Sequence, residues 1–400
     1  MAEEPGGRQY KNITDLVDSV LRRAITERAS DIHFEPARDS FGIRFRVDGF
    51  LHPVEVFEKQ GQDEIISRIK VLASMEIMEK RFPQDGHFEI YDKDGKIYNL
   101  RVSTYPTTFG EAAVLRLLDR KDAMMGLESL GFEFNQLADI KRMIALPYGM
   151  CLITGPTGAG KTTLLYSVLK TLNTPSNNIV TIEDPIEFQM DTIRQLQVRE
   201  NIGLTFPKAL RAVVRQDPDV IMLGELRDIE TVQMSVQAAL SGILVFATFH
   251  TFDVPGIVIR FLEMGVPRSV ISHILIGVVS GRLVRKICEK CKEPYTLSKF
   301  EKDVLGDSLS GISLKWGRGC KECGGSGYLD REGVFEVVVF DEEIKSYIME
   351  GKNISQLGGV FQKKGTKSLW EAMISKVSRG VTTVEEALRI VGVKDVSQEK

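Results

Sequence analysis

The N-terminal part of the chain mixes helical and strand-like hydrophobic patterns. Apolar residues recur at helical spacing over 11–28 and predict an amphipathic helix there. In FGIRFRVDGFL, residues 41–51, apolar and polar positions alternate, and Asp48-Gly49 favours a hairpin turn between two strands. A second helix is predicted near 64–79. Further strands are predicted at 87–91, 97–103 and 112–118. The pattern indicates a small α+β domain over residues 1–119, followed by a linker at 120–133.

The pattern changes after residue 134, where short apolar runs are separated by helix-compatible segments. These runs cover 150–154, 179–182, 220–223 and 243–248. Strands at this spacing imply βα units, so residues 134–284 are predicted to form an α/β domain with a mostly parallel, buried sheet. Two cysteine pairs interrupt the pattern at 285–330. Beyond them a helical C-terminal region is predicted over 331–400, with its clearest segments at 341–350, 354–363 and 383–391.

Composition narrows the class of protein. The chain has 400 residues, of which 43% are hydrophobic, as expected of a globular protein with two or three domains. Its net charge of −3 argues against a nucleic-acid partner, which usually leaves a basic footprint. The start of the chain does not resemble a signal peptide, and the most apolar long stretch, 266–284, contains Arg268, His273 and Arg282. We therefore expect a soluble, cytoplasmic protein.

The stretch GPTGAGKTT, residues 155–163, fits the phosphate-binding loop pattern G-x-x-x-x-G-K-[ST]. Glycines let the backbone N–H groups wrap a phosphate, and the N-terminus of the following helix adds positive charge. A glycine-rich surface turn would lack the buried strand before the loop and the helix after it, and this sequence predicts both. We predict that ATP and Mg²⁺ are bound by Gly155, Pro156, Thr157, Gly158, Ala159, Gly160, Lys161, Thr162 and Thr163.

Polar side chains follow the other predicted strands of the parallel sheet. Glu183, Asp184 and Glu187 come after the second strand, Glu225 after the third and His250 after the fourth. Each has another explanation, because a carboxylate can cap the next helix and a lone histidine is more often a core residue. Together with a phosphate-binding loop they favour phosphoryl transfer, which needs a metal, a positioned water with its base, and cations on the γ-phosphate.

The four cysteines outside the sheet form two C-x-x-C pairs, Cys288/Cys291 and Cys320/Cys323, with 28 residues between the pairs. Two such pairs present four thiolates to one tetrahedral ion, so we predict a structural Zn²⁺ site. A redox motif would place a single C-x-x-C at the start of a helix in a βαβ unit, which does not fit. Cys151 lies within an apolar strand and is expected to be a buried core residue.

Several stretches, in this order and spacing, resemble the secretion ATPase superfamily, and within it the type II secretion and type IV pilus assembly ATPases. The matching text is ASDIHFEP (29–36), RFRVDG (44–49), RVSTYPTTFGE (101–111), GPTGAGKTT, TIEDPIEF (181–188), RQDPDVIMLGELRD (215–228), AALSGILVFATFHT (238–251) and the cysteine segment. The resemblance covers nearly all of residues 11–395. It does not include the long N-terminal domain through which assembly ATPases dock to a membrane partner. Either the sequence is a piece of a longer chain or this member docks in another way.

The resemblance implies a homo-hexameric motor built from a PAS-like N-terminal domain and a RecA-like ATPase domain. At matching positions, Glu187 would activate the attacking water, Glu225 would hold or orient the metal, and His250 would sense the γ-phosphate. Arginines of the N-terminal domain and of the ATPase core would complete the site. These are Arg101 and Arg116, which reach nucleotide at domain or subunit contacts, and Arg211, Arg215 and Arg227. A solvated strand face is the other interpretation of Arg101 and Arg116.

Three positions depart from the family pattern: Ile243, Phe252 and Gly281 stand where the family often has His, Asn and Gln. None of them is a proposed phosphate or metal contact, so activity is expected to be retained.

The same resemblance sets the expected function and partners. The chain would hydrolyse ATP to power pilus assembly or type II secretion at the cytoplasmic face of the inner membrane. It would contact inner-membrane platform and docking proteins, associate with the membrane only through them, and bind no nucleic acid. A nucleic-acid translocating hexamer and a scaffold that binds ATP without turnover are the alternatives. The acidic net charge argues against the first. The second is disfavoured by the retained site residues, which are Lys161, Glu187, Glu225 and His250.

Overall fold

The computed structural model describes residues 11–93, 95–119, 125–251, 253–305, 309 and 311–391. The chain divides into two compact units, Met1–Asp122 and Ala123–Lys400, and each unit is described by itself. Some residues named in the sequence analysis lie outside the described residues. They are part of the linker (120–124), Phe252 and the last residues of the C-terminal region (392–400).

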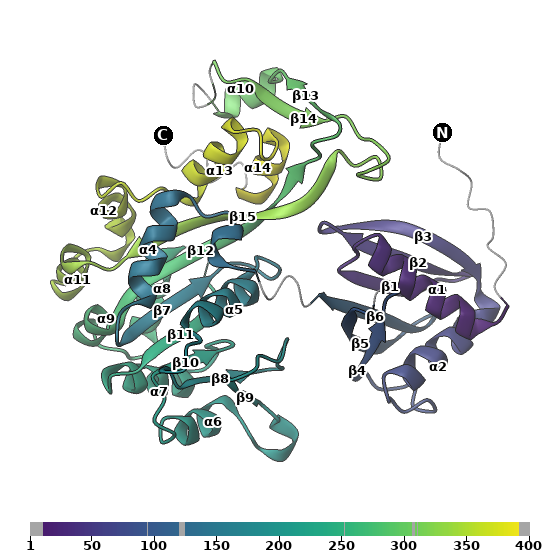
Figure 1. The fold of residues 1–400 in the computed structure, drawn as a ribbon, viewed down its shortest axis with the longest axis horizontal. Coiled ribbons are helices and arrows are strands. Elements are labelled where there is room, and N and C mark those ends of the chain that lie inside the picture. The colour runs from purple at the N-terminus through teal and green to yellow at the C-terminus, as the bar shows by residue number, and fades with distance from the viewer. Residues whose placement is uncertain are drawn as a thin grey trace. The chain divides into compact units, whose positions relative to one another are not determined.

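The first unit is an antiparallel sheet with two helices on one face (Figure 1). The strand order is β3-β2-β1-β6-β5-β4. Its elements are α1 (Ile13–Thr26), β1 (Asp31–Pro36), β2 (Ser40–Val47), β3 (Phe50–Glu58), η1 (Lys59–Gly61), α2 (Gln62–Leu72), β4 (Gln84–Tyr91), β5 (Ile97–Thr107) and β6 (Gly110–Asp119). The alternating apolar side chains of β2, Phe41, Ile43 and Phe45, are fully buried under the helices, as the pattern predicted. The PAS-like assignment stays a prediction.

Helix α2 is shorter than the predicted 64–79 segment, and the physical reason is a tertiary contact. The helix ends at Leu72, and Ser74 has a positive φ of 57°. The ammonium of Lys70 is fully buried, pairs with Glu111 at 2.6 Å and donates to the Glu79 carbonyl at 2.6 Å. This contact turns the chain back toward the sheet, although the apolar residues at 75–78 suit a continuing helix.

The second unit contains a seven-stranded sheet in the order β15-β12-β7-β11-β10-β8-β9. All neighbours pair parallel except β12 and β15, which pair antiparallel. The strands are β7 (Gly149–Thr154), β8 (Ile179–Glu183), β9 (Arg194–Gln197), β10 (Val220–Leu223), β11 (Leu244–Phe249), β12 (Leu275–Ile287) and β15 (Tyr328–Val339). The mixed α/β class with a mostly parallel sheet is confirmed.

Helices cover both faces of this sheet. Two helices, with the short turn η2 (Leu127–Ser129), pack on one face: α4 (Phe134–Ile144) and α5 (Lys161–Leu172). The other face carries α6 (Phe206–Val213), α7 (Ile229–Leu240), α8 (Val254–Glu263), α9 (Arg268–Ile274), α11 (Glu342–Met349) and α12 (Leu357–Lys363). Two short turns, η3 (Glu200–Ile202) and η5 (Ile354–Gln356), complete this part. Leu127 and Leu130 are buried in the core, so this half of the predicted linker belongs to the second unit.

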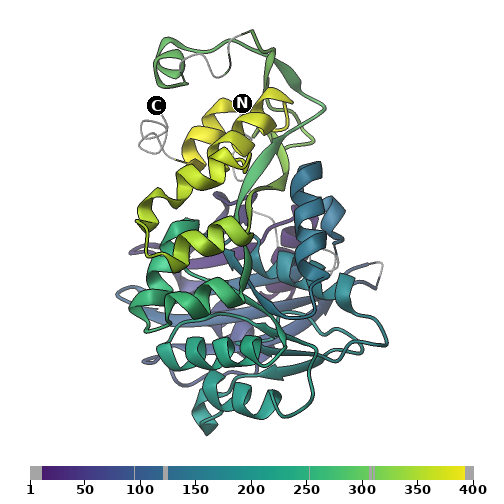
Figure 2. The ribbon, with the colours of Figure 1, turned by 90° about the vertical axis from the view of Figure 1, so that its left-hand side faces the viewer.

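Strands β12 and β15 extend beyond β7 as a two-stranded ribbon, and the last helices lie against it. The remaining elements here are β13 (Lys292–Tyr295), α10 (Lys299–Leu305), β14 (Leu314–Gly317), α13 (Leu369–Ser378) and α14 (Val384–Val391). The yellow helices α13 and α14 lie beside the green ribbon in Figure 1 and again in the view turned by 90° (Figure 2). The ribbon therefore joins the sheet to the cysteine segment.

The ribbon corrects two sequence predictions. The prediction of a helical region from residue 331 is wrong for 331–339, because these residues complete β15. The α/β core predicted to end at 284 continues into β12, which runs to Ile287. The apolar stretch 266–284 is divided between α9, a helix that packs on the sheet, and β12, a strand within it. Among the described residues, no helix is long and apolar enough to cross a membrane.

Candidate nucleotide site and metal centre

The phosphate-binding loop connects the end of β7 to the start of α5, as the sequence predicted. Gly155, Gly158 and Gly160 have φ values of 145°, 77° and 83°. A Cβ at Gly155 would lie 2.6 Å from the carbonyl oxygen of Gly281 on β12, so only glycine fits there. The loop tip at 156–158 and the Thr162 side chain are exposed. The backbone is therefore shaped to wrap an anion at the N-terminus of α5.

The ammonium of Lys161 turns back onto its own loop. It donates to the carbonyl oxygens of Gly155 at 2.7 Å and Pro156 at 3.1 Å. Burial lowers the pKa of Lys161; the Glu225 carboxylate opposes this change, and the Arg282 guanidinium adds to it. Two cations and one carboxylate thus meet at the loop.

Glu225 is the centre of the polar cluster at the strand ends. Its side chain is 14% exposed, and its carboxylate lies 2.5 Å from the Arg227 guanidinium and 3.5 Å from Nε2 of His250. The same carboxylate interacts electrostatically with Lys161 at the start of α5, so groups that follow β10 and β11 lie near the loop that follows β7. A carboxylate in this position can hold or orient a hydrated Mg²⁺, which prefers oxygen ligands.

Hydrogen bonds between strand ends hold this cluster in place. The buried hydroxyl of Thr154 donates to the carbonyl of Thr251 at 2.6 Å and accepts from its N–H at 3.2 Å. The hydroxyl of Thr248 donates to the Gly224 carbonyl at 2.5 Å. These bonds fix the residues that flank His250 and Glu225.

The carboxylates after β8 have different environments. Glu183 is 3% exposed and accepts hydrogen bonds from Tyr166, Thr181 and Gln195. Asp184 is exposed, and Glu187 is half-buried in the loop that follows. Donors within the protein therefore satisfy the Glu183 carboxylate. The role of Glu187 as the base stays a prediction.

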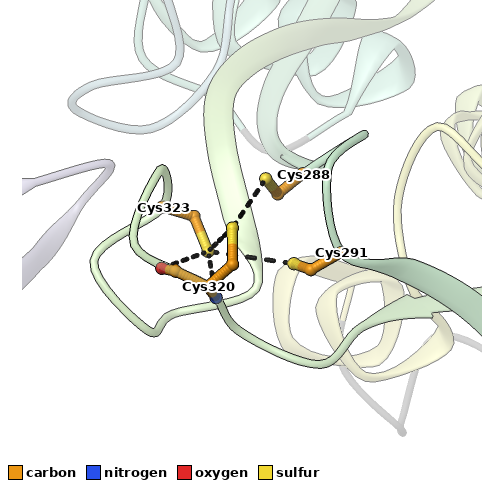
Figure 3. Close-up of side chains that lie close together, drawn as sticks. All are labelled: Cys288, Cys291, Cys320 and Cys323. Carbon is orange, nitrogen blue, oxygen red and sulfur yellow. Dashed lines mark hydrogen bonds between the residues drawn. The ribbon is translucent and has the colours of Figure 1, made fainter.

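The four cysteines converge at the end of the ribbon (Figure 3). Their sulfur atoms all lie within 4.8 Å of one another, with Sγ–Sγ distances of 3.8 Å for Cys288–Cys320, 3.9 Å for Cys291–Cys323 and 3.7 Å for Cys320–Cys323. Tetrahedral Zn–S bonds of about 2.3 Å place sulfurs about 3.8 Å apart, so the donor set fits zinc.

Backbone donors favour the thiolate that a metal needs. Although burial opposes the change, the N–H groups of Cys320 and Gly327 lower the pKa of Cys323 to about 6. Burial raises the pKa of Cys291 to about 12. The fifth cysteine, Cys151, is buried in β7 as predicted, and burial raises the pKa of its thiol to about 12.

Comparison with known proteins identifies the family. The sequence model of a family described as "Type II/IV secretion system protein" matches residues 8–389. The chain belongs to this family. It is 43% identical over 379 residues to the type IV pilus assembly ATPase PilB of Thermus thermophilus, covering 93% of this chain and 42% of that protein. It is 42% identical over 379 residues to the type II secretion system protein E of Pseudomonas aeruginosa, covering 94% and 75%. The chain thus spans less than half of the Thermus relative.

Solved structures agree with the family assignment. The ATPase DotB of Legionella pneumophila superposes with a TM-score of 0.72 at 22% identity, covering 97% of this chain and 98% of DotB, and supports the fold alone. The pilus retraction motor PilT, solved with bound ADP, superposes with a TM-score of 0.64 at 25% identity, covering 96% and 97%. The resemblance to type II secretion and type IV pilus ATPases is confirmed, and the chain is an ATP-hydrolysing enzyme of this family.

The predicted arginines of this family member occupy different surroundings. Arg227 joins the cluster at Glu225, Arg211 pairs with Glu230 on the surface, and Arg215 follows α6 with an exposed side chain. In the first unit, Arg116 pairs with Asp31 at 2.9 Å and lies opposite Arg101 on the neighbouring strand. Roles for Arg101, Arg116 and Arg215 stay predictions.

Sequence reasoning missed one residue of the site. Arg282 lies on β12, and its guanidinium influences Lys161. Its sequence neighbourhood is an apolar run, and only the parallel pairing of Ser280 with Thr154 brings it to the loop. No local signal could have found it.

Proposed function

We propose that this chain is the motor of a machine that assembles a type IV pilus or drives type II secretion. The proposed enzyme is a homo-hexamer that hydrolyses ATP at the cytoplasmic face of the inner membrane. The proposal further assigns a RecA-like ATPase core to the second unit and a PAS-like domain to the first. The names of the relatives, pilus assembly ATPase and type II secretion system protein, support the process.

The single observation that carries the proposal is the cluster of Lys161, Glu225 and His250 beside the phosphate-binding loop. A scaffold that only binds nucleotide would have no need for a carboxylate and a histidine at that place. ATP supplies the phosphoryl group, and Mg²⁺ neutralises its developing charge. The side chains and backbone of this chain would bind and orient ATP and Mg²⁺ and would accept the proton of the attacking water.

Each residue has a proposed task. The loop N–H groups and Lys161 would bind the phosphates, which requires Lys161 to leave the carbonyls of Gly155 and Pro156. The Thr162 hydroxyl and Glu225 would hold the metal. Glu187 would take the proton of the attacking water, and His250 would hydrogen-bond to the γ-phosphate. Zn²⁺ bound by the four cysteines would stabilise the end of the ribbon.

The proposed partners follow from the process. They are inner-membrane platform and docking proteins, and the chain would associate with the membrane through them alone. Arg101 and Arg116 would supply cations to a nucleotide held by another domain or subunit. Turnover would then depend on assembly of the hexamer.

The test is ATPase activity as a function of protein concentration, with Arg101→Ala beside Arg44→Ala. Arg44 lies on β2 and pairs with Glu35 at 2.6 Å, so it controls for loss of an arginine from this sheet. Activity per chain should rise as hexamers form. A cation supplied by a neighbour is worth about 10³–10⁵-fold in turnover, so Arg101→Ala should lose most activity while Arg44→Ala retains it.

Concentration-independent turnover together with a fully active Arg101→Ala protein would contradict the hexameric motor. Stimulation of turnover by DNA would instead favour a nucleic-acid translocase.

A further inference from the structure

Glu183 is a buried carboxylate that the proposed chemistry does not use. It ends β8 and is 3% exposed. Its Oε1 accepts from the Thr181 hydroxyl at 2.6 Å and Nε2 of Gln195 at 3.1 Å, and its Oε2 accepts from the Tyr166 hydroxyl at 2.6 Å. No ion pair involves Glu183 in the described part of the chain. Burying a carboxylate is costly unless several donors compensate, so this set of donors calls for an explanation.

The same side chains also hold the backbone that follows Glu187. The N–H of Phe188 donates to the Tyr166 hydroxyl oxygen at 3.3 Å, and its carbonyl accepts from Nε2 of Gln195 at 2.8 Å. The side-chain Oε1 of Gln195 in turn accepts from the N–H of Met190 at 2.7 Å. The Phe188 ring packs edge-on against the Tyr166 ring, with 5.9 Å between centroids. Hydrogen bonds therefore hold both the backbone N–H and the backbone carbonyl of Phe188, and ring packing holds its side chain.

Tyr166 connects this loop to the phosphate-binding helix. It lies on α5, whose first residue is Lys161, and its ring is fully buried. Gln195 lies on the edge strand β9, opposite Thr181 of β8. The loop that carries Glu187 is thus attached on one side to α5 and on the other to β9.

We propose that Tyr166, Glu183 and Gln195 are positioning residues that hold the peptide between Glu187 and Phe188 against helix α5. The Glu187 carboxylate is thereby presented at a fixed place relative to the phosphate-binding loop. This inference rests on the proposed role of Glu187 as the base. A displacement of about 1 Å in a reacting group can cost about 10²-fold in rate, so such a framework has a measurable effect.

The first experiment compares Tyr166→Phe with Tyr295→Phe. Tyr166→Phe keeps the ring and removes the hydroxyl that Glu183 and Phe188 share. Tyr295→Phe is a matched control, because the Tyr295 hydroxyl also donates to a buried glutamate, Glu301, at 2.8 Å. We expect Tyr166→Phe to lower kcat about 10- to 100-fold with KM for ATP within about threefold, because the phosphate contacts are untouched. Tyr295→Phe should leave kcat and KM unchanged.

The second experiment asks whether Tyr166 acts through Glu187. In a Glu187→Gln background, Tyr166→Phe should have little further effect on kcat, because the group that it positions is already lost. Mere loosening of the fold would lower kcat by the same factor in both backgrounds.

The outcomes separate this inference from the proposed function. A folded Tyr166→Phe protein with wild-type kcat, or an equal loss in both backgrounds, overturns the positioning role even when Glu187→Gln is inactive. A fully active Glu187→Gln protein instead removes the base assignment on which the inference rests. If Tyr166→Phe fails to fold, Gln195→Leu on the half-buried edge strand decides by the same two measurements.

Discussion

The nucleotide site and the cysteine site lie along the same unit but are organised in different ways. The four cysteine sulfurs already lie at spacings that a tetrahedral ion requires, and they come from two short knuckles. The nucleotide site draws Lys161 from the start of α5 and Glu225 and His250 from the residues after β10 and β11, and the ammonium of Lys161 donates to carbonyls of its own loop. The cysteine site therefore already has all four sulfur ligands in place. In the nucleotide site, Lys161 must give up its hydrogen bonds to the loop carbonyls before it can bind a phosphate.

Strand β12 connects the two regions. Gly281 and Arg282, near its middle, face the phosphate-binding loop, and Cys288 directly follows its end. The N–H of Cys288 donates to the Gly327 carbonyl at 3.0 Å, beside the second knuckle. Strand β12, paired with β15, thus links the cysteine end to the loop over a distance of several residues, and we expect the two regions to respond separately to most perturbations.

Removal of the metal should have the largest effect and should be confined to the cysteine end. Structural zinc contributes about 10–16 kcal/mol of binding free energy in zinc-finger peptides, and that energy is folding energy. Chelation should therefore unfold residues 285–330, as seen by loss of hydrogen-exchange protection there. Mg-ATP binding at the loop should persist.

Elemental analysis of protein purified without chelators checks the premise, with about one zinc per chain expected for a Cys₄ site. Absence of zinc, with all four thiols freely titratable, would contradict a structural metal. Loss of nucleotide binding on chelation would instead show that the two regions are not separable.

Glu187→Gln should affect only the nucleotide site. A general base contributes about 10²–10⁴-fold, so turnover should fall by that factor while Mg-ATP binding is retained. Glu263→Gln is a suitable control, because Glu263 is exposed and pairs with Arg260 on the surface of α8. Turnover and nucleotide affinity measured on both variants decide the matter. Near-wild-type turnover in Glu187→Gln would exclude it as the base.

The two regions also differ in how far the sequence could predict them. The phosphate-binding loop and the cysteine pairs are local patterns, and apolar runs marked β7, β8, β10 and β11 correctly. Strand β15 was missed because charged residues, DRE, interrupt the apolar pattern of its first half, and because its pairing with β12 is long-range. The end of α2 depends on Lys70 reaching Glu111, a tertiary contact that overrides helix propensity. Arg282 was missed for the same reason, since its place depends on strand pairing.

Glu386→Ala should destabilise the cysteine end through its helices. Glu386 on α14 is fully buried and accepts from Arg285 at 2.8 Å and from Arg389 at 2.7 Å. Removing one partner of a buried ion pair costs about 3–5 kcal/mol, which denaturant titration would measure. The exposed neighbour Glu385→Ala is the control. An equal, small change in both variants would show that the buried pair contributes little.

The stability that Glu386 provides should depend on pH. Burial alone would raise the pKa of Glu386, but hydrogen bonds from Arg389 and Arg285 lower it below its ordinary value. A lowered folded-state pKa gives stability that is present above the unfolded pKa, about 4.3, and is lost as the pH falls through the folded value. The difference in unfolding free energy between wild type and Glu386→Ala should therefore shrink below about pH 4. A difference that stayed constant in acid would exclude the carboxylate charge as its source.

Thr154→Val should have the smallest effect and tests how the strand ends of the nucleotide site are held. The substitution keeps the shape of a fully buried side chain and removes the hydroxyl that bonds both the carbonyl and the N–H of Thr251. Leaving such buried groups without their partner costs about 1–3 kcal/mol in unfolding free energy. Thr171→Val is the matched control, because the exposed Thr171 hydroxyl donates to the Ser167 carbonyl on its own helix, and a change within about 0.5 kcal/mol is expected there. Because Thr251 follows His250, Thr154→Val should also lower turnover, whereas zinc content should not change. If stability and turnover both match those of Thr171→Val, the strand ends are held by sheet packing alone, and the nucleotide site would be as self-contained as the cysteine site.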